Sequence, residues 1–361
     1  MAKGKRKWWL LFSLLLFTIF LFAAPQRIRE ETVLGSRWIT ALEAESSDEP
    51  SASLMPGVEL VPFILGERFG YIGSNGRFAI NQMRNVYVSM SETYWAQYDP
   101  LPFNIQIMNK QNESVFVIEQ PLGYPVFLDN RIFIVGSEQN SISALGPDGT
   151  ELWSYYFPSP LTCIDAAGGY FLGGSLDGVV TLLNRMGSPA FIPFEPGGSN
   201  MSVILGCAIS QDASRLALIS GINEQRFLLM ERAGDNYRVV YHEFLGSGFR
   251  RPVHINFVDN DSKVVFEREG GLGIYSIGSR RSININLEGE IVTMDDSGED
   301  GFLFLITSQG SNEKSLVTIK YPGLIVSKAP FRSYNTFFAR RDTRLYLGGD
   351  TTIAMLELQR H

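Results

Sequence analysis

The residue types that most often perform covalent chemistry are scarce in this chain. Its 361 residues contain two cysteines, Cys163 and Cys207, and three histidines, His242, His254 and His361. A zinc site needs clustered ligands, such as two C-x2-C pairs, and no such spacing occurs. A catalytic serine or cysteine needs a histidine base, and no G-x-S-x-G motif is present. The sequence therefore designates no catalytic, cofactor-binding or metal-ligating residue, and it predicts no cofactor.

The two cysteines lie in runs of apolar and small residues, LTCIDA and LGCAIS. A buried cysteine often behaves as a small hydrophobic residue. We therefore expect Cys163 and Cys207 to be packing residues. A disulfide between them stays open as an alternative if the chain folds outside the cytoplasm.

Five aspartates could supply oxygen ligands for a cation if the fold brings them to one channel. Cation sites of this kind use several carboxylates and carbonyls. The competing interpretation is turn chemistry, because aspartate is common where strands reverse. The five residues are Asp165, Asp177, Asp259, Asp295 and Asp296.

Two further features could contact a partner. The first is the aromatic stretch from Tyr94 to Tyr98, YWAQY, for which packing between strands is the simpler interpretation. The second is a set of arginine pairs at expected strand ends, which predict either a patch for an anionic partner or solvated turns. These pairs are Arg250–Arg251, Arg280–Arg281 and Arg340–Arg341.

The composition indicates which elements must position these residues. The chain is 45% hydrophobic and 12% aromatic, so wholesale disorder is excluded. Its 35 glycines are more than the usual share and favour many strands and turns. The net charge of -7 argues against nucleic acid as a partner, which would call for a basic surface.

The N-terminus is typical of a membrane anchor. Residues 1–7, MAKGKRK, form a basic tip, and the uncharged run from Trp8 to Ala24 follows. Seventeen residues lie near the lower limit for a spanning helix, so we predict a transmembrane signal anchor at 8–24. The positive-inside rule then places the chain in the cytoplasmic membrane as a single-pass protein, with its N-terminus inside. A cleaved, secreted form stays open, although neither Ala23 nor Ala24 offers a good cleavage pattern.

Residues 25–57 are predicted to be a juxtamembrane segment and an acidic Ser/Pro linker. The stretch EAESSDEPSASLMPG at 43–57 has little to bury and suits a solvated spacer. The preceding residues could form a short juxtamembrane helix, with Trp38 either at the membrane interface or on the folded domain.

From residue 58 the chain reads as short apolar or alternating runs bounded by Gly, Asn and Asp, which is typical of strands. Similar units of about four runs recur at 77–119, 124–158, 161–198, 203–246, 252–289, 290–331 and 334–361. This period predicts an all-β fold, a seven-bladed β-propeller over 58–361, behind one N-terminal transmembrane helix. Because the last unit has three runs, we expect strand 58–65 to close the ring. Six or eight blades stay open, because residues 66–119 are irregular.

Residues 141–186 resemble the PQQ-like β-propeller repeat. Asp148, Gly149 and Trp153 correspond to the turn Asp, the Gly and the Trp of its first motif, and Gly173, Gly174, Asp177, Gly178 and Leu182 to its second motif. In that family the Asp and Gly make the tight turn and the Trp docks between blades. Residues 208–220, AISQDASRLALIS, resemble a WD40-type repeat without its WD and GH dipeptides.

The resemblance implies a fold more than a function. The PQQ-like family includes quinoprotein dehydrogenases, some with a vicinal disulfide that this chain lacks, and non-enzymatic scaffolds. One of those scaffolds is a bacterial outer-membrane assembly lipoprotein, but this chain has no lipid-acceptor cysteine. We therefore expect a membrane-anchored, extracytoplasmic scaffold that binds a protein or cell-envelope partner through propeller loops. The alternative is a quinone- or cation-dependent enzyme such as a dehydrogenase.

Overall fold

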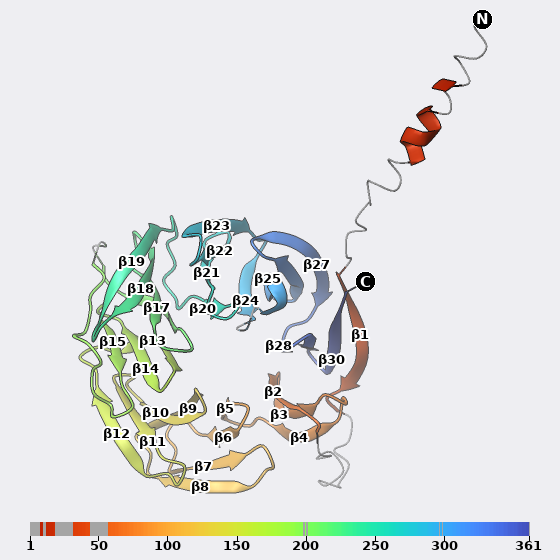
Figure 1. Ribbon diagram of the computed structural model, residues 1–361. Coiled ribbons are helices and arrows are strands. Elements are labelled where there is room, and N and C mark those ends of the chain that lie inside the picture. Colours follow the sequence, from red (N-terminus) through yellow and green to blue (C-terminus); the bar gives the residue numbers. More distant parts are fainter. Residues whose placement is uncertain are drawn as a thin grey trace, which may run out of the picture.

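A computed structural model shows eight β-sheets arranged as blades around a central axis (Figure 1). It describes residues 8–9, 12–18, 32–43, 57–197, 199, 201–295, 297 and 299–360. Within each blade the strands are antiparallel, and consecutive strands along the chain are neighbours in the sheet. The blades are numbered here in chain order from the first one that begins after residue 57.

The first four blades hold the strands up to Leu183. Blade 1 contains β2 (Leu60–Leu65), β3 (Arg68–Gly73) and β4 (Phe78–Met83). Blade 2 contains β5 (Tyr87–Met90), β6 (Tyr94–Tyr98), β7 (Asn104–Asn109) and β8 (Ser114–Glu119). Blade 3 contains β9 (Gly123–Leu128), β10 (Arg131–Gly136), β11 (Ser141–Leu145) and β12 (Glu151–Tyr156). Blade 4 contains β13 (Leu161–Ala167), β14 (Tyr170–Ser175) and β15 (Val180–Leu183).

The last four blades complete the ring. Blade 5 contains β16 (Ile204–Ile209), β17 (Arg215–Ser220), β18 (Arg226–Ala233) and β19 (Asn236–Phe244). Blade 6 contains β20 (Ile255–Val258), β21 (Lys263–Arg268), β22 (Gly271–Ser276) and β23 (Arg281–Asn286). Blade 7 contains β24 (Glu290–Met294), the 3-10 turn Glu299–Gly301, β25 (Phe302–Gln309), β26 (Glu313–Lys320) and β27 (Leu324–Arg332). Blade 8 contains β28 (Thr336–Arg341), β29 (Arg344–Gly349), β30 (Thr352–Arg360) and β1 (Thr32–Ala41).

The ring is closed by a strand from the N-terminal part of the chain, but not by the predicted one. β1 pairs with β30 along its whole length, from Thr32 opposite Arg360 to Ala41 opposite Thr352. The prediction of strand 58–65 as the closing strand is therefore wrong, and so is the juxtamembrane helix before the linker. β1 supplies the outermost strand of blade 8 and covers an edge that would otherwise be open. Trp38 lies on the propeller, where its indole N–H donates to Ser74 O at 3.0 Å.

The predicted count of seven blades is wrong, because the structure has eight. The strand at 60–65 begins a blade of its own, in which Val61, Phe63 and Leu65 alternate with less buried residues. Residues 77–119, predicted as one irregular unit, are divided between blades 1 and 2. From residue 124 onwards the strands of each predicted repeat fall within a single blade.

The inner strand of blade 1, β2, runs in the opposite direction to β28, the inner strand of blade 8. Glu59, just before β2, pairs with Arg344 at 3.0 Å, close to the point where β28 ends. Gly66, just after β2, lies beside Asn335 and Asp350, near the point where β28 begins. A blade of four antiparallel strands starts and ends on the same side of the ring, whereas three strands cross to the other side. β2 starts on the side of the ring where β28 ends. After three antiparallel strands, β4 therefore ends on the other side, where β5 starts.

The predicted anchor is not supported by the helical residues in the structure. These are Trp8, Trp9 and residues 12–18, whereas a membrane crossing needs about 20 apolar residues. Among the described residues, none of the helical segments has the length and apolar character to span a bilayer. The predictions of a transmembrane helix at 8–24 and of a single-pass membrane location are thus wrong. The basic tip at 1–7 and most of the linker lie outside the described residues.

The apolar interior is divided among the gaps between blades. Each buried cluster joins two neighbouring blades, and clusters of this kind occur all the way around the ring. Between blades 5 and 6, for example, the Phe227 and Phe266 rings stack with their centres 4.4 Å apart. Both faces of most inner strands are buried, which explains their nearly continuous apolar sequences.

Candidate functional site

The ring has two faces that differ in how the chain passes through them. The innermost strand of blades 2 to 8 begins on one face, which we call the loop face, because the loops between blades lead to it. The same strands end on the opposite face in tight turns to the second strand, and we call this the hairpin face. The central channel opens on both faces, and each opening has its own cavity.

The hairpin-face cavity has a volume of about 530 Å³ and a polar lining that includes carboxylates and the two arginines Arg340 and Arg341. Its carboxylates are Glu92, Asp165, Asp261 and Asp342. Three of these groups are engaged: Asp165 accepts from the backbone N–H of Ile209 and Asp261 from that of Gln211, at 2.8 and 2.7 Å, and Glu92 pairs with Arg341. Burial raises the pKa of Asp261, and the hydrogen bond from Gln211 opposes that shift.

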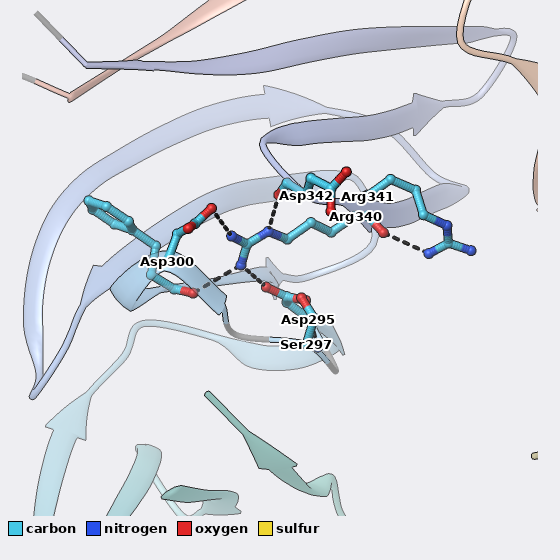
Figure 2. A network of polar contacts seen from close by, with 7 residues as sticks. Asp295, Ser297, Asp300, Arg340, Arg341 and Asp342 are labelled. Carbon is cyan, nitrogen blue, oxygen red and sulfur yellow. Dashed lines mark hydrogen bonds and ion pairs between the residues drawn. The ribbon is translucent and has the colours of Figure 1, made fainter. Parts of the chain in front are cut away.

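A buried arginine joins blades 7 and 8 on the hairpin face. Figure 2 shows the Arg340 guanidinium between Asp295 and Asp300. Its Nη1 lies 2.7 Å from Asp295 Oδ2 and donates to Phe302 O at 3.1 Å, while both charged side chains are almost fully buried. Ser297 donates to the other Asp295 oxygen through its backbone N–H and its hydroxyl, at 2.9 and 2.8 Å. The pair is neutral as a unit and well hydrogen-bonded, which a buried ion pair requires.

Similar links between neighbouring blades recur around the hairpin face. Arg131 of blade 3 donates to the carbonyls of Gly169 and Tyr170 in blade 4, at 3.1 and 2.6 Å. Asp165 caps a backbone N–H of blade 5, Asp261 of blade 6 caps one in blade 5, and the Asp259 N–H donates to Ser297 O in blade 7. Side chains thus connect the turns of adjacent blades, and this face is fixed by polar contacts.

The loop-face cavity differs in both charge and polarity. It has a volume of about 420 Å³, and its apolar lining includes Leu161, Ile164, Leu176, Val203, Leu205 and Ile222. Among the described residues its lining contains Arg250 and Arg251 but no carboxylate. Arg251 is held by Glu267 at 2.6 Å, whereas Arg250 is exposed and has no ion pair within the described part of the chain. The opening is therefore apolar with a basic rim.

Large apolar side chains are exposed on the loop face. Leu101 and Leu122 are 88% and 83% exposed, and both lie in loops that lead between strands. Tyr98 stacks between Tyr87 and Tyr124, with ring centres 5.9 and 6.3 Å apart, and Tyr124 also lines the loop-face cavity. Further exposed apolar residues on this face are Phe103, Leu176, Met201 and Tyr334. Exposed apolar surface of this kind, beside a cavity, is typical of a binding face.

Of the five aspartates proposed as cation ligands, the four that the structure describes are not brought together at one site. Asp165, Asp259 and Asp295 lie on the hairpin face, whereas Asp177 lies on the loop face and accepts from the Ser175 hydroxyl at 2.5 Å. Asp259 pairs with Lys263. Asp296 is outside the described residues. Within the described chain, no three His, Cys, Asp or Glu side chains form a group suited to a metal.

The three arginine pairs do not form one patch. Arg250 and Arg251 are on the loop face, whereas Arg280 and Arg281 lie in the turn before β23 on the opposite side. Arg340 is buried, so the interpretation of that pair as a solvated turn is wrong for this residue. Its neighbour Arg341 reaches into the hairpin-face cavity and pairs with Glu92 at 2.5 Å. Arg340 and Arg341 are adjacent on one strand, so their side chains point to opposite sides of the sheet.

The aromatic stretch 94–98 has two roles. Trp95 is buried, its ring packs on Phe69 at 5.2 Å, and its indole N–H donates to Asn109 O. Tyr98 instead belongs to the stack of tyrosines near the loop face. Most of the stretch therefore packs between blades, and one ring contributes to the candidate surface.

The histidines have no common site. His242 is exposed on β19, and His254 is half-buried just before β20, where burial lowers its pKa. His361 is outside the described residues. The cysteines are both free, and only Cys207 is fully buried, whereas Cys163 is partly accessible.

The residues of the PQQ-like motifs lie at turns and at a blade interface. Gly149 has a φ of 84°, a conformation that favours glycine, and Asp148 accepts from the N–H and hydroxyl of Thr150. Trp153 packs against Phe133 of its own blade and against Gly187 of blade 4. Asp177 and Gly178 form the turn between β14 and β15, and Gly173, Gly174 and Leu182 lie in those two strands.

The exposed loop-face residues were not singled out from the sequence. Leu101 and Phe103 occur in the segment DPLPF, and Leu122 occurs in QPLG. Proline is rare inside strands, so a large apolar residue next to a proline between two strands is expected to lie in a loop. No sheet buries the side chain there. That signal was available and would have indicated the loop face.

Comparisons with known proteins agree with the architecture. A protein of Treponema pallidum (strain Nichols), described as uncharacterized, is 25% identical over 297 residues, which is 81% of this chain and 78% of its own length. The crystal structure of BamB from Moraxella catarrhalis superimposes with a TM-score of 0.60 at 12% identity, over 90% of this chain and all of BamB. The computationally designed Ika8 protein also gives a TM-score of 0.60 at 12% identity, over 83% and 96% of the two chains.

The two solved structures show similarity of fold alone, because their identity to this chain is low. A family model described as "beta-propeller protein" matches residues 1–361. With the eight sheets around one axis and the strand that closes the ring, this match shows that the chain belongs to the β-propeller proteins.

Proposed function

We propose that this β-propeller is an interaction scaffold that binds a partner protein on its loop face. The observation that carries the proposal is the exposure of large apolar side chains on that face. Leu101, Phe103 and Leu122 are 88%, 73% and 83% exposed, and they lie in the loops before and after blade 2's outer strands. Large apolar side chains of this kind supply apolar area that a partner can bury.

The cavity beside these loops supports the same face. Its lining is largely apolar, and the exposed Arg250 lies at the rim. The chain as a whole carries a net charge of -7, whereas the described lining of this opening holds two arginines and no carboxylate. An anionic group on the partner, next to apolar residues, would be complementary to this opening.

The hairpin face supplies the rigidity that such a scaffold needs. Side-chain bonds join neighbouring blades there, and the buried Arg340–Asp295 pair is one of them. Loops on a rigid frame are where binding residues concentrate. The turn residues Asp148 and Gly149 and the inter-blade Trp153 also support assigning the repeats to the PQQ-like type.

Site-specific photo-crosslinking tests the proposal. A photoreactive amino acid is placed at Leu101, Leu122 or Leu176 on the loop face, and at the exposed hairpin-face residues Met186 and Leu324 as matched controls. Crosslinks are formed in the native cells and identified by mass spectrometry, and binding is then measured with the purified partner. We expect loop-face positions to capture one recurring protein that binds in purified form. Capture of that protein only from Met186 or Leu324 would overturn the assignment.

A further inference from the structure

The innermost strands of blades 4 and 5 place both cysteines of the chain side by side. Cys163 lies on β13 and Cys207 on β16. Two side-chain bonds connect these strands. The Thr162 hydroxyl donates to Ile204 O, and Asp165 Oδ2 accepts from the Ile209 N–H at 2.8 Å. Cys163 lies between Thr162 and Asp165 along β13, and Cys207 lies between Ile204 and Ile209 along β16, so the same two links enclose both thiols.

The side chains at this point leave room for the two sulfurs to meet. Gly174 of β14 lies opposite Cys163, and a Cβ at Gly174 would fall 2.7 Å from Cys163 Sγ and 2.5 Å from Ile204. The absence of a side chain at Gly174 therefore allows blades 4 and 5 to approach. Cys163 Sγ also lies 3.9 Å from Ile204 O, so its thiol is directed toward β16.

The two thiols differ in access. Cys163 lines the loop-face cavity and is partly exposed, whereas Cys207 is buried among Leu172, Ile204 and Leu218. A hydrogen bond with the Cys163 thiol and burial both raise the pKa of Cys207. A small reagent that enters the cavity would therefore meet Cys163 first.

We propose that Cys163 and Cys207 are an oxidation site that forms a reversible disulfide between blades 4 and 5, with a small-molecule disulfide such as oxidised glutathione as the oxidant. Both thiols are reduced in the structure. The inference is independent of the proposed docking function, because it rests on the contact between the strands.

The reaction is a pair of thiol–disulfide exchanges. The Cys163 sulfur, as thiolate, attacks one sulfur of the oxidant, forms a mixed disulfide and releases one thiolate of the reagent. Cys207 then loses its proton to solvent and attacks the Cys163 sulfur, which releases the second thiolate of the reagent. The two protein thiols are oxidised to one disulfide, and the oxidant is reduced to two thiols.

Of the two blades that the disulfide would join, blade 4 is less regular than blade 5. Among the described residues, blade 4 has three strands, and the segment after β15 pairs with it through the isolated bridges Val180–Phe194 and Leu183–Pro189 and the bond from the Ala190 N–H to Leu182 O. A covalent link at Cys163 would tie blade 4 to the complete sheet of blade 5. Because a disulfide restricts the unfolded chain, it should raise the melting temperature.

The test uses the full-length wild-type chain. The purified protein is equilibrated with oxidised glutathione, quenched with a maleimide in denaturant so that the buried thiol also reacts, and digested without reduction for peptide mapping. We expect a peptide pair joined by Cys163–Cys207, loss of both maleimide sites, and recovery of both after dithiothreitol. The melting temperature of the oxidised protein should exceed that of the reduced protein by about 5 °C.

Two serine variants serve as matched controls. In Cys207→Ser, Cys163 has no second thiol, so we expect a stable glutathione adduct on Cys163. In Cys163→Ser, the remaining thiol is buried, so we expect it to stay unmodified. A stable glutathione adduct on Cys163 of the wild type, with Cys207 still a thiol, would overturn the proposal. So would full maleimide labelling of both cysteines after the oxidant, or a disulfide that forms only between two molecules.

Discussion

The two faces of the propeller use side chains in opposite ways. On the hairpin face, charged and polar side chains bond to the backbone of the next blade, as Arg131 and Asp165 do. On the loop face, apolar side chains such as Leu101 and Leu122 extend into solvent without contributing to the ring. For these residues, the contribution to stability and the availability to a partner therefore lie on different faces. Substitutions on the hairpin face should lower stability, and those on the loop face should change binding.

The largest effect is expected for Arg340→Met. The substitution leaves the Asp295 carboxylate buried without its partner, and breaking a buried pair in this way costs about 3–5 kcal/mol. The free energy of unfolding from urea titration measures the loss. Arg341→Met is the matched control, because Arg341 is more exposed and its pairs with Glu92 and Glu59 should contribute at most about 1 kcal/mol. Equal losses for the two variants would contradict the assigned role of Arg340.

A smaller loss of stability is expected for Asp165→Ala. The change removes the acceptor for the N–H groups of Ala166 and Ile209, and an unsatisfied buried donor costs about 1–3 kcal/mol. Asp177→Ala on the loop face serves as the control, because Asp177 is exposed and should change stability by about 0.5 kcal/mol or less. Urea unfolding of both variants decides whether polar side chains on the two faces differ in this way.

The loop face should respond in binding rather than in stability. Leu122→Asp places a charge where we expect apolar contact, so affinity for the crosslinked partner should fall at least tenfold, or about 1.4 kcal/mol. Unfolding should be unchanged to within about 0.5 kcal/mol, since the side chain is exposed. Met186→Asp, at an equally exposed hairpin-face turn, is the control. Calorimetric titration with the purified partner measures the affinity of both variants. An equal loss of affinity in Leu122→Asp and Met186→Asp would contradict the distinction between the faces.

The smallest effect concerns pH. Burial lowers the pKa of His254 in the folded chain, so the unfolded chain binds a proton more readily as the pH falls below about 6.5. Stability should therefore decrease between pH 7.5 and pH 5.5, and His254→Gln should reduce this decrease. Urea midpoints at the two pH values check this, and an identical pH dependence in His254→Gln would contradict it.

The repeat pattern predicted the class of fold and most blade boundaries, because inner strands buried on both sides leave continuous apolar sequences. The count failed at the N-terminal end of the ring. TVLGSRWITA at 32–41 contains one charged residue, Arg37, and several small ones, and it differs from the inner strands because an outermost strand is half exposed. Its pairing with β30 spans more than 300 residues of sequence, and no local pattern encodes that contact.

The candidate surface was only partly predictable. Tyr98 was included in an aromatic stretch, but its neighbours in the stack, Tyr87 and Tyr124, come from different strands. The opposite fates of Arg340 and Arg341 depend on which side of one strand each residue faces. Contacts between residues distant in sequence set both outcomes, whereas turn chemistry at Asp148 and Gly149 is local and was predicted.

Hydrogen exchange of the chain alone and with its purified partner tests the difference between the two faces most directly. In the free protein, we expect the hairpin turns near Asp165 and Asp261 to be protected already, because side chains hold their N–H groups. On binding, protection should increase in the loop-face segments around Leu101, Leu122 and Leu176 and stay constant in the hairpin turns. Increased protection confined to the hairpin turns, with the loop-face segments unchanged, would contradict the assignment of binding to the loop face.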